Sequence, residues 1–182
     1  MFFKFTFNQF NQRRPKIIFK PNFRFEKITD ISLDILGKLE VKAIFLDVDN
    51  TLCSYRDKKP LKGAIEWVRN AEKAGYKVYI VSNNFKKRVS SVAKRYSLPF
   101  VSFAIKPLPT GFNKAAKILG LRKRDCVIIG DQIYTDILGG NLARMKSILV
   151  EPVELETGII IKTRRYFERG IRKNFPFYKG DE

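Results

Sequence analysis

The chain contains 182 residues, of which 45% are hydrophobic, and it carries a formal net charge of +18 with no histidine. This length is sufficient for one globular domain with its own core. No stretch reaches the roughly 18 uninterrupted apolar residues of a membrane span, and the N-terminus lacks the continuous apolar region of a signal peptide. We therefore expect a cytoplasmic protein without a transmembrane segment, whose acid–base chemistry near neutral pH depends on carboxylates or lysine.

The positive charge is concentrated at the two ends of the chain. Residues 1–25 contain six basic residues and no acidic one, and residues 162–173 contain six basic residues and one acid, Glu168. Such a field attracts nucleic acid, an anionic membrane or a phosphorylated substrate. Cys53 and Cys126 are too few for a disulfide framework, so we expect them to be buried, reduced thiols.

From about residue 41 onward, strand and helix patterns alternate. Apolar runs predict strands at 41–47, 77–82, 100–105, 125–131 and 146–150. Helical stripes between these strands begin at Leu61, Phe85, Phe112 and Tyr134. The alternation predicts an α/β fold, a three-layer, Rossmann-like parallel sheet of about five strands with helices on both faces.

Four consecutive predicted strands end in polar or charged residues. The carboxyl ends of parallel strands meet at one edge of a sheet, which is where such folds bind ligands. We therefore expect the side chains at these ends to form one site. In chain order they are Asp47, Asp49 and Thr51, then Ser82, Asn83 and Asn84, then Lys106, and finally Gly130, Asp131, Thr135 and Asp136.

The chemistry of these side chains suits a phosphate and a metal ion. Asp47 and Asp49 leave the same face of an extended chain, and they repel each other unless a cation lies between them or one is protonated. With Asp131 they offer oxygen ligands for Mg²⁺. Ser82 and a backbone N–H beside Asn83 can donate hydrogen bonds to a phosphoryl group. A lysine at the third strand end can stabilise its charge, and an aspartate can form an aspartyl-phosphate.

The segments DVDNT, VSNN, IKP and GDQIYTD resemble, in this order, the four motifs of the haloacid dehalogenase (HAD) superfamily. More narrowly, LDVDNTL, YIVSNN, KP and VIIGDQIYTDILGGN resemble the YqeG-like group of HAD subfamily IIIA phosphatases, over about residues 21–171. That group is related to phosphatases that act on phosphatidylglycerophosphate. Residues 1–20 have no counterpart in the pattern. The resemblance implies a HAD-type sheet and a phosphatase.

The resemblance also implies the roles of the matching residues. Asp47 would be the nucleophile and Asp49 the general acid and base, with Thr51 positioning Asp49. Ser82 would bind the phosphoryl group and Lys106 would stabilise its charge.

The implied magnesium site uses the same loop and the fourth motif. Mg²⁺ would be bound by Asp47, Asp131 and the backbone carbonyl of Asp49. Asp136 would support the metal or its waters, and Thr135 belongs to the same motif.

Three other interpretations of the acidic motif are disfavoured. An EF-hand calcium loop needs glycine at its sixth position and glutamate at its twelfth, where this chain has Leu52 and Lys58. A response-regulator receiver domain places its carboxylates and lysine in a different strand order. A HAD fold that had lost catalysis would lack a required side chain, and none is missing here.

No cap domain is expected, because residues 52–61 are too few for a domain and residues 84–100 hold only one predicted helix. An open site suits a phosphate that is presented on a large molecule or a surface. We expect three regions: a basic, aromatic N-terminal extension at 1–25, a HAD-like phosphatase domain at 26–157, and a basic amphipathic C-terminal helix and tail at 158–182.

Aromatic and basic residues occur together at both ends. Eight of the 16 phenylalanines lie within the first 25 residues. Such a composition is typical of contact with an anionic membrane surface. The alternative is that these segments pack on the core and their charges are solvated. In the C-terminal segment, the positions at helical spacing beside Lys and Arg are Ile159, Ile160, Thr163, Tyr166, Phe167 and Ile171.

The leading hypothesis is a Mg²⁺-dependent phosphatase that dephosphorylates phosphatidylglycerophosphate while bound peripherally at the inner face of the membrane. One alternative is a HAD phosphatase acting on a soluble, nucleotide or nucleic-acid phosphate. Another is a nucleic-acid- or ribosome-binding protein that uses the basic ends. Composition does not separate lipid from RNA, because aromatic contacts and positive charge serve both.

Overall fold

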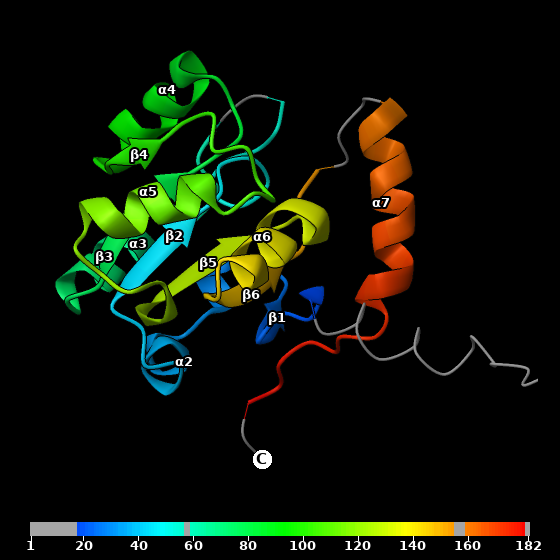
Figure 1. The fold of residues 1–182 in the computed structure, drawn as a ribbon, viewed down its shortest axis with the longest axis horizontal. Coiled ribbons are helices and arrows are strands. Elements are labelled where there is room, and N and C mark those ends of the chain that lie inside the picture. The colour runs from blue at the N-terminus through cyan, green and yellow to red at the C-terminus, as the bar shows by residue number, and fades with distance from the viewer. Residues whose placement is uncertain (1–17, 57–58, 155–158, 181–182) are drawn as a thin grey trace, which may run out of the picture.

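The computed structural model describes residues 18–56, 59–154 and 159–180. Its centre is a six-stranded sheet in the order β1-β6-β5-β2-β3-β4, and every neighbouring pair is parallel (Figure 1). The predicted α/β class is therefore confirmed. The strands are β1 (Phe23–Phe25), β2 (Ala43–Leu46), β3 (Lys77–Val81), β4 (Phe100–Val101), β5 (Cys126–Gly130) and β6 (Lys146–Val150).

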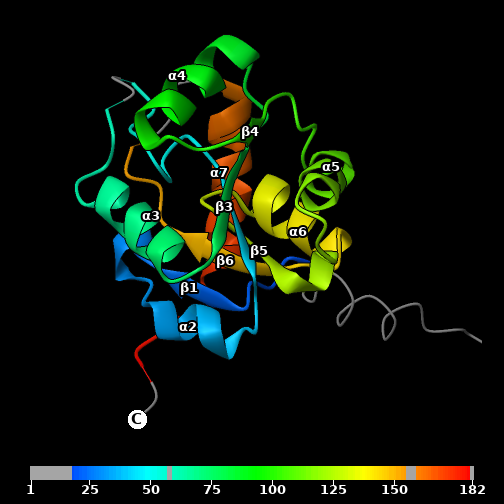
Figure 2. The same ribbon diagram turned by 90° about the vertical axis from the view of Figure 1, so that its left-hand side faces the viewer.

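Helices cover both faces of the sheet, as Figure 2 shows. Side chains of β2 alternate between two cores: Ile44 packs with residues of α2, α3 and α4, whereas Phe45 packs with residues of α5. The helices are α2 (Leu33–Lys38), α3 (Ala64–Lys73), α4 (Lys86–Tyr96), α5 (Thr110–Ile118), α6 (Leu138–Leu142) and α7 (Ile159–Arg172), with 3₁₀ turns η1 (Ile28–Asp30) and η2 (Lys123–Asp125) and a π-helical turn η3 (Ile133–Ile137).

The strand order reverses beside β2. The chain runs from β2 to β3 and β4 on one side, and then returns to β5 and β6 on the other side. β2 and β5 pair in register as far as Leu46 and Ile129, and the Asp47 N–H continues the pairing to the Ile129 carbonyl at 3.0 Å. Such a reversal leaves a crevice at the carboxyl ends of the two strands. Asp47 and Asp131 follow these two ends.

Two parts of the sheet differ from the prediction. Residues 23–25, which the sequence placed in the N-terminal extension, form an edge strand on β6 with Phe25 buried. A three-residue strand with a central arginine is too short to show a period-two pattern. The strand predicted at 100–105 ends at Val101, because Phe103 and Ile105 have φ values of +54° and +58°, which a strand does not permit.

The cysteines and the apolar character of the helices were also the subject of predictions. Cys53 and Cys126 are both buried free thiols, as predicted. Among the helices of the described residues, none has the length and apolar character needed to cross a bilayer.

Gly140 in α6 provides a test of the packing between this helix and β5. A Cβ atom at Gly140 would overlap Ile128 Cγ2. We expect Gly140→Ala to lower the free energy of unfolding by about 1–3 kcal/mol, because the core must shift to accept the methyl group. Urea denaturation followed by circular dichroism measures the change.

Gly37→Ala in α2 is the matched control. No described atom lies within 4 Å of a Cβ at that position, so alanine should be neutral or stabilise by about 0.5–1 kcal/mol through its helix propensity. Equal losses in the two variants would contradict the packing argument.

Candidate active site

A tight turn after β2 holds the first two aspartates at the crevice. Asn50 adopts a left-handed conformation, with φ of +58°, which asparagine tolerates better than most residues. Its N–H donates to the Cys53 carbonyl at 2.8 Å, and the Leu52 N–H donates to the Val48 carbonyl at 3.0 Å. The chain therefore reverses directly after the DVD sequence, and the carboxylates of Asp47 and Asp49 are both buried at the strand end.

Asp47, Asp131 and Asp136 form a compact acid cluster, with one carboxylate oxygen of each lying within 4.8 Å of the others. Burial raises the pKa of Asp131 well above its usual range, and repulsion by Asp136 and Asp47 adds to the effect, although Arg165 opposes it. Burial also raises the pKa of Asp136 to about 6, against the attraction of Lys106. Three acids this close favour a bound cation.

Gly130, the last residue of β5, makes room for one member of the acid cluster. A Cβ at this position would overlap the Asp136 carboxyl group. Asp136 Oδ2 accepts a hydrogen bond from the Gln132 N–H at 3.0 Å, which fixes the carboxylate against the strand end. Thr135 instead bonds to the Gln132 side chain at 3.0 Å. The π-helical turn thus directs Asp136 into the acid cluster and Thr135 toward Gln132.

Lys106 supplies a buried ammonium group beside the acid cluster. Nζ donates to Asp47 Oδ1 at 2.6 Å, to Asp136 Oδ1 at 2.6 Å and to the Val81 carbonyl at 3.0 Å. All three donors of the ammonium are therefore used. Burial alone would lower the pKa of Lys106, but Asp136 and Asp47 raise it above its ordinary value. Lys106 is thus a fixed positive charge.

Asn83 holds the loop that carries Lys106. Its Nδ2 donates to the Lys106 carbonyl at 2.9 Å, and its Oδ1 accepts from the Lys106 N–H at 2.6 Å. The side chain therefore positions Lys106 and does not face the acid cluster. The phosphate contact expected at this strand end was a backbone N–H beside Asn83, and that group is compatible with this arrangement.

Asp49 lies apart from the acid cluster, with its side chain bound by two residues that received no role from the sequence. Oδ1 accepts from Arg88 Nε at 3.1 Å and also from Nη2, and Oδ2 accepts from Asn84 Nδ2 at 2.8 Å. Burial raises the pKa of Asp49 and Asp47 adds to this, while the hydrogen bond from Arg88 opposes it. Asn84 Nδ2 also donates to Ser82 Oγ at 3.1 Å, so these residues link the first and second strand ends.

The remaining predicted residue, Thr51, is fully buried, and its Oγ1 has no hydrogen-bond partner among the described residues. Arg88 was missed in the sequence analysis, although a signal existed: it lies in the first turn of α4, four residues after Asn84, where its side chain can return to the strand ends. The structure thus brings together Asp47, Lys106, Asp131 and Asp136 directly, and Asp49 joins Ser82 through Asn84.

Helix α7 contributes charged side chains to the site from the far end of the chain. Arg165 Nη1 donates to the Asp131 carbonyl at 2.8 Å and Nη2 to Asp131 Oδ2, while Arg172 Nη2 also donates to the Asp131 carbonyl. The fully buried Glu168 accepts from Arg165 at 3.1 Å and from the Tyr134 N–H at 3.2 Å. The missed signal was the i, i+3, i+7 spacing of these three charged residues.

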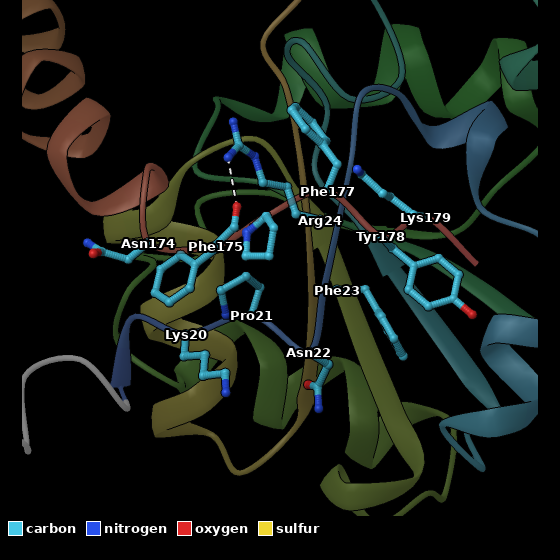
Figure 3. A pocket seen from close by; sticks show the side chains of 11 residues that line it. Lys20, Pro21, Asn22, Phe23, Arg24, Asn174, Phe175, Phe177, Tyr178 and Lys179 are labelled. Carbon is cyan, nitrogen blue, oxygen red and sulfur yellow. Dashed lines mark hydrogen bonds between the residues drawn. The ribbon is translucent and has the colours of Figure 1, made fainter. Parts of the chain in front are cut away.

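A separate hollow of about 400 Å³ lies between residues 20–24 and residues 174–179 (Figure 3). Arg24 lines it and donates to the Phe175 carbonyl at 2.8 Å. Its lining includes none of the predicted site residues. This hollow is therefore separate from the site predicted at the strand ends.

Comparison with known proteins identifies the family of this chain. The family model described as haloacid dehalogenase-like hydrolase matches residues 54–144, and the family model described as mitochondrial PGP phosphatase matches residues 6–97. "Probable phosphatase YqeG" of Bacillus subtilis (strain 168) is 39% identical over 156 residues, which cover 86% of this chain and 91% of that protein. The chain belongs to the haloacid dehalogenase-like hydrolases.

Solved structures of HAD-family proteins share the fold at low sequence identity. A HAD-superfamily hydrolase from Ehrlichia chaffeensis superimposes with a TM-score of 0.55 at 16% identity, covering 71% of this chain and 97% of that one. A HAD family hydrolase from Deinococcus radiodurans R1, solved with phosphate and sodium, gives 0.54 at 15% identity, covering 69% and 89%. The predicted HAD-type sheet is therefore confirmed.

The acid cluster of this HAD-like hydrolase fits a divalent cation. Its three carboxylates converge, and Asp131 Oδ1 is buried without a hydrogen-bond partner among the described residues. A buried, unpaired carboxylate oxygen is costly unless a cation or water satisfies it. The sequence prediction named Asp49 as a metal ligand through its backbone carbonyl, and the engagement of its side chain with Arg88 is compatible with that role.

Removal of Arg165 tests whether α7 stabilises the acid cluster. We expect Arg165→Gln to lower the free energy of unfolding of the metal-free protein by about 3–5 kcal/mol, because it leaves the buried Asp131 carboxylate without its ion pair. Arg169→Gln, on the exposed face of the same helix, should change it by less than about 0.5 kcal/mol. Urea unfolding measures both, and similar stabilities of the two variants would exclude this role.

Proposed function

We propose that this HAD-like hydrolase is a Mg²⁺-dependent phosphomonoesterase that acts through an aspartyl-phosphate and dephosphorylates phosphatidylglycerophosphate at a membrane surface. The observation that carries the reaction class is the contact of 2.6 Å between Lys106 Nζ and Asp47 Oδ1 beside the acid cluster. It supports the proposal because Asp47, the proposed nucleophile, lies next to a fixed positive charge. The match to the PGP phosphatase family model supports the lipid substrate.

In the first step, an oxygen of Asp47 bonds to phosphorus while the bond between phosphorus and the ester oxygen breaks. Asp49 gives its proton to the leaving oxygen, which departs as the alcohol. The raised pKa of Asp49 supports this role, because it favours the protonated form. In the second step, Asp49 accepts a proton from water, whose oxygen attacks phosphorus and releases inorganic phosphate and the Asp47 carboxylate.

Other groups stabilise the phosphoryl oxygens during both steps. Lys106 offers its ammonium charge. Among the described contacts Ser82 Oγ accepts hydrogen bonds from Asn84, so its own hydrogen can be donated to the phosphoryl group. Mg²⁺ would be held by Asp47, Asp131 and the Asp49 backbone carbonyl, with Asp136 in support, and would act as a Lewis acid on a phosphoryl oxygen.

Features of α7 support peripheral contact with an anionic membrane. Tyr166 and Phe167 are each more than half exposed, and they are accompanied by exposed Lys162, Arg169 and Lys173. Aromatic and basic side chains on one exposed helix suit the region of lipid headgroups.

Not every apolar position that the sequence analysis assigned to membrane contact on this helix is exposed like Tyr166 and Phe167. Ile171 packs inward against the cluster that includes Ile133. The side chains at 159–161 and the extension at 1–17 lie outside the described residues.

Phosphate release from phosphatidylglycerophosphate in mixed detergent micelles with Mg²⁺ tests the proposal directly. We expect turnover by the wild-type protein and a loss of at least about a thousandfold in Asp47→Asn, because the nucleophile is removed. Asp34→Asn, which changes an exposed carboxylate in α2, is the control and should retain activity. Turnover of nucleoside monophosphates or RNA 5′-phosphates with none of the lipid would refute the lipid substrate.

Thermal unfolding gives a readout of the metal that is independent of activity. We expect Mg²⁺ at about a hundredfold excess over its dissociation constant to raise the unfolding midpoint by roughly 5–10 °C, because it binds the folded state. Chelator should reverse the shift, Asp131→Asn should reduce it, and Asp34→Asn should keep it. An unchanged midpoint for the wild-type protein would argue against a magnesium site.

A further inference from the structure

Two loops that carry site residues also expose large apolar side chains. Residues 82–85 lead from β3 into α4, and residues 103–108 lead from β4 to α5 (Figure 1). The exposed fractions are 73% for Phe85, 59% for Phe103, 53% for Ile105 and 54% for Leu108. We call these four residues the apolar rim. Because Ser82, Asn83 and Lys106 lie on the same loops, the apolar rim flanks the active site.

Contacts between the loops fix the apolar rim in place. The Phe85 and Phe103 ring centroids lie 5.4 Å apart. The Phe103 N–H donates to the Asn84 carbonyl at 3.0 Å, and the Leu108 N–H donates to the Ile105 carbonyl at 2.9 Å. The Asn83 side chain hydrogen-bonds to both the N–H and the carbonyl of Lys106, which follows Ile105. These apolar side chains are therefore held outward by ordered backbone.

The backbone of the second loop also carries strain. Phe103 and Ile105 have positive φ, a conformation that is especially unfavourable for a β-branched residue such as Ile105. Such strain persists only where the surroundings impose it, and it is concentrated at functional sites. Here the result is two exposed apolar side chains with no core to fill, which suggests that they contact something outside the chain.

The chain segment that carries the apolar rim has charged side chains of one sign only. Residues 73–124 contain thirteen Lys or Arg residues and no Asp or Glu. Lys86 and Lys87 follow Phe85 directly, and both are exposed. The positive charge of this segment therefore favours an anionic partner for the apolar side chains.

We propose that the apolar rim inserts into the interface of an anionic lipid bilayer and so brings the active site to the membrane, an inference that rests on the proposed lipid substrate. Phenylalanine, isoleucine and leucine would enter below the headgroups, while Lys86 and Lys87 meet their phosphates. The bilayer is favoured over RNA because bases stack on aromatic rings, and Ile105 and Leu108 offer none.

The test is cosedimentation with vesicles of phosphatidylcholine, alone or mixed with phosphatidylglycerol. We expect the wild-type protein to pellet with the anionic vesicles and less with the neutral ones. The double variant Phe85→Ser with Phe103→Asn should bind them at least about tenfold more weakly, because burying one phenylalanine is worth about a factor of ten or more in a partition constant. Asparagine is chosen because it tolerates the positive φ of Phe103.

Ile118→Ser with Leu142→Ser is the matched control. Both residues are exposed and lie at or near the C-terminal ends of α5 and α6, which run back toward the opposite edge of the sheet. This variant should bind vesicles like wild type. The proposal that the apolar rim inserts into the bilayer would be overturned if both double variants bound vesicles equally well, or if both lost vesicle binding to the same extent. It would also be overturned if the wild-type protein were retained on RNA and did not bind vesicles.

Hydrolysis assays separate this proposal from the proposed function. Both double variants should hydrolyse a soluble phosphate ester at the wild-type rate, since neither touches the reacting groups, and only the rim variant should lose hydrolysis of lipid in vesicles. If the wild type hydrolyses lipid in micelles while the rim variant keeps full activity on vesicles, only the proposal of membrane insertion by the rim is wrong. If the wild type hydrolyses no lipid in micelles, the lipid substrate fails, and the vesicle binding data still decide the rim.

Discussion

An ammonium group buried between two carboxylates organises the active-site end of this sheet. Lys106 can be buried only because Asp47 and Asp136 pair with it. The Asn83 side chain positions the loop that carries the lysine, and Gly130 leaves room for the Asp136 carboxylate. The motif residues are therefore connected physically as well as by their shared chemistry.

Every acid of the site has a positively charged neighbour. Asp49 is paired with Arg88, and Asp131 is paired with Arg165, in addition to the pairs made by Lys106. Isolated buried carboxylates would become protonated or destabilise the fold. Part of the excess of basic residues in this chain thus has an internal use.

Much of this arrangement was predictable from the sequence, because strand and helix periods are local patterns. The alternating runs predicted the parallel sheet, and the rule that parallel strands end together predicted that Asp47, Lys106 and Asp131 would meet. The three-residue β1 gave no such pattern. The strand predicted at 100–105 is shorter than expected, because a run of apolar residues does not show that Phe103 has a positive φ.

The charged residues of α7 show a different limit. Charged residues at helical spacing, such as Arg165, Glu168 and Arg172, usually predict a solvent-exposed face. The apolar residues of the helix would then predict that the opposite face is buried. The structure buries the charges and exposes Tyr166. Burial of a charge depends on partners far away in the sequence, here Asp131, and no local pattern reports them.

The position of α7 in the chain also sets the order in which the site can be completed. Asp131 precedes Arg165 by 34 residues, so its strand is synthesised before the guanidinium groups of α7 that compensate it. On a translating ribosome, the crevice acids are exposed to one another without these counterions until α7 has left the exit tunnel. The acid cluster therefore acquires these counterions only after α7 has been synthesised.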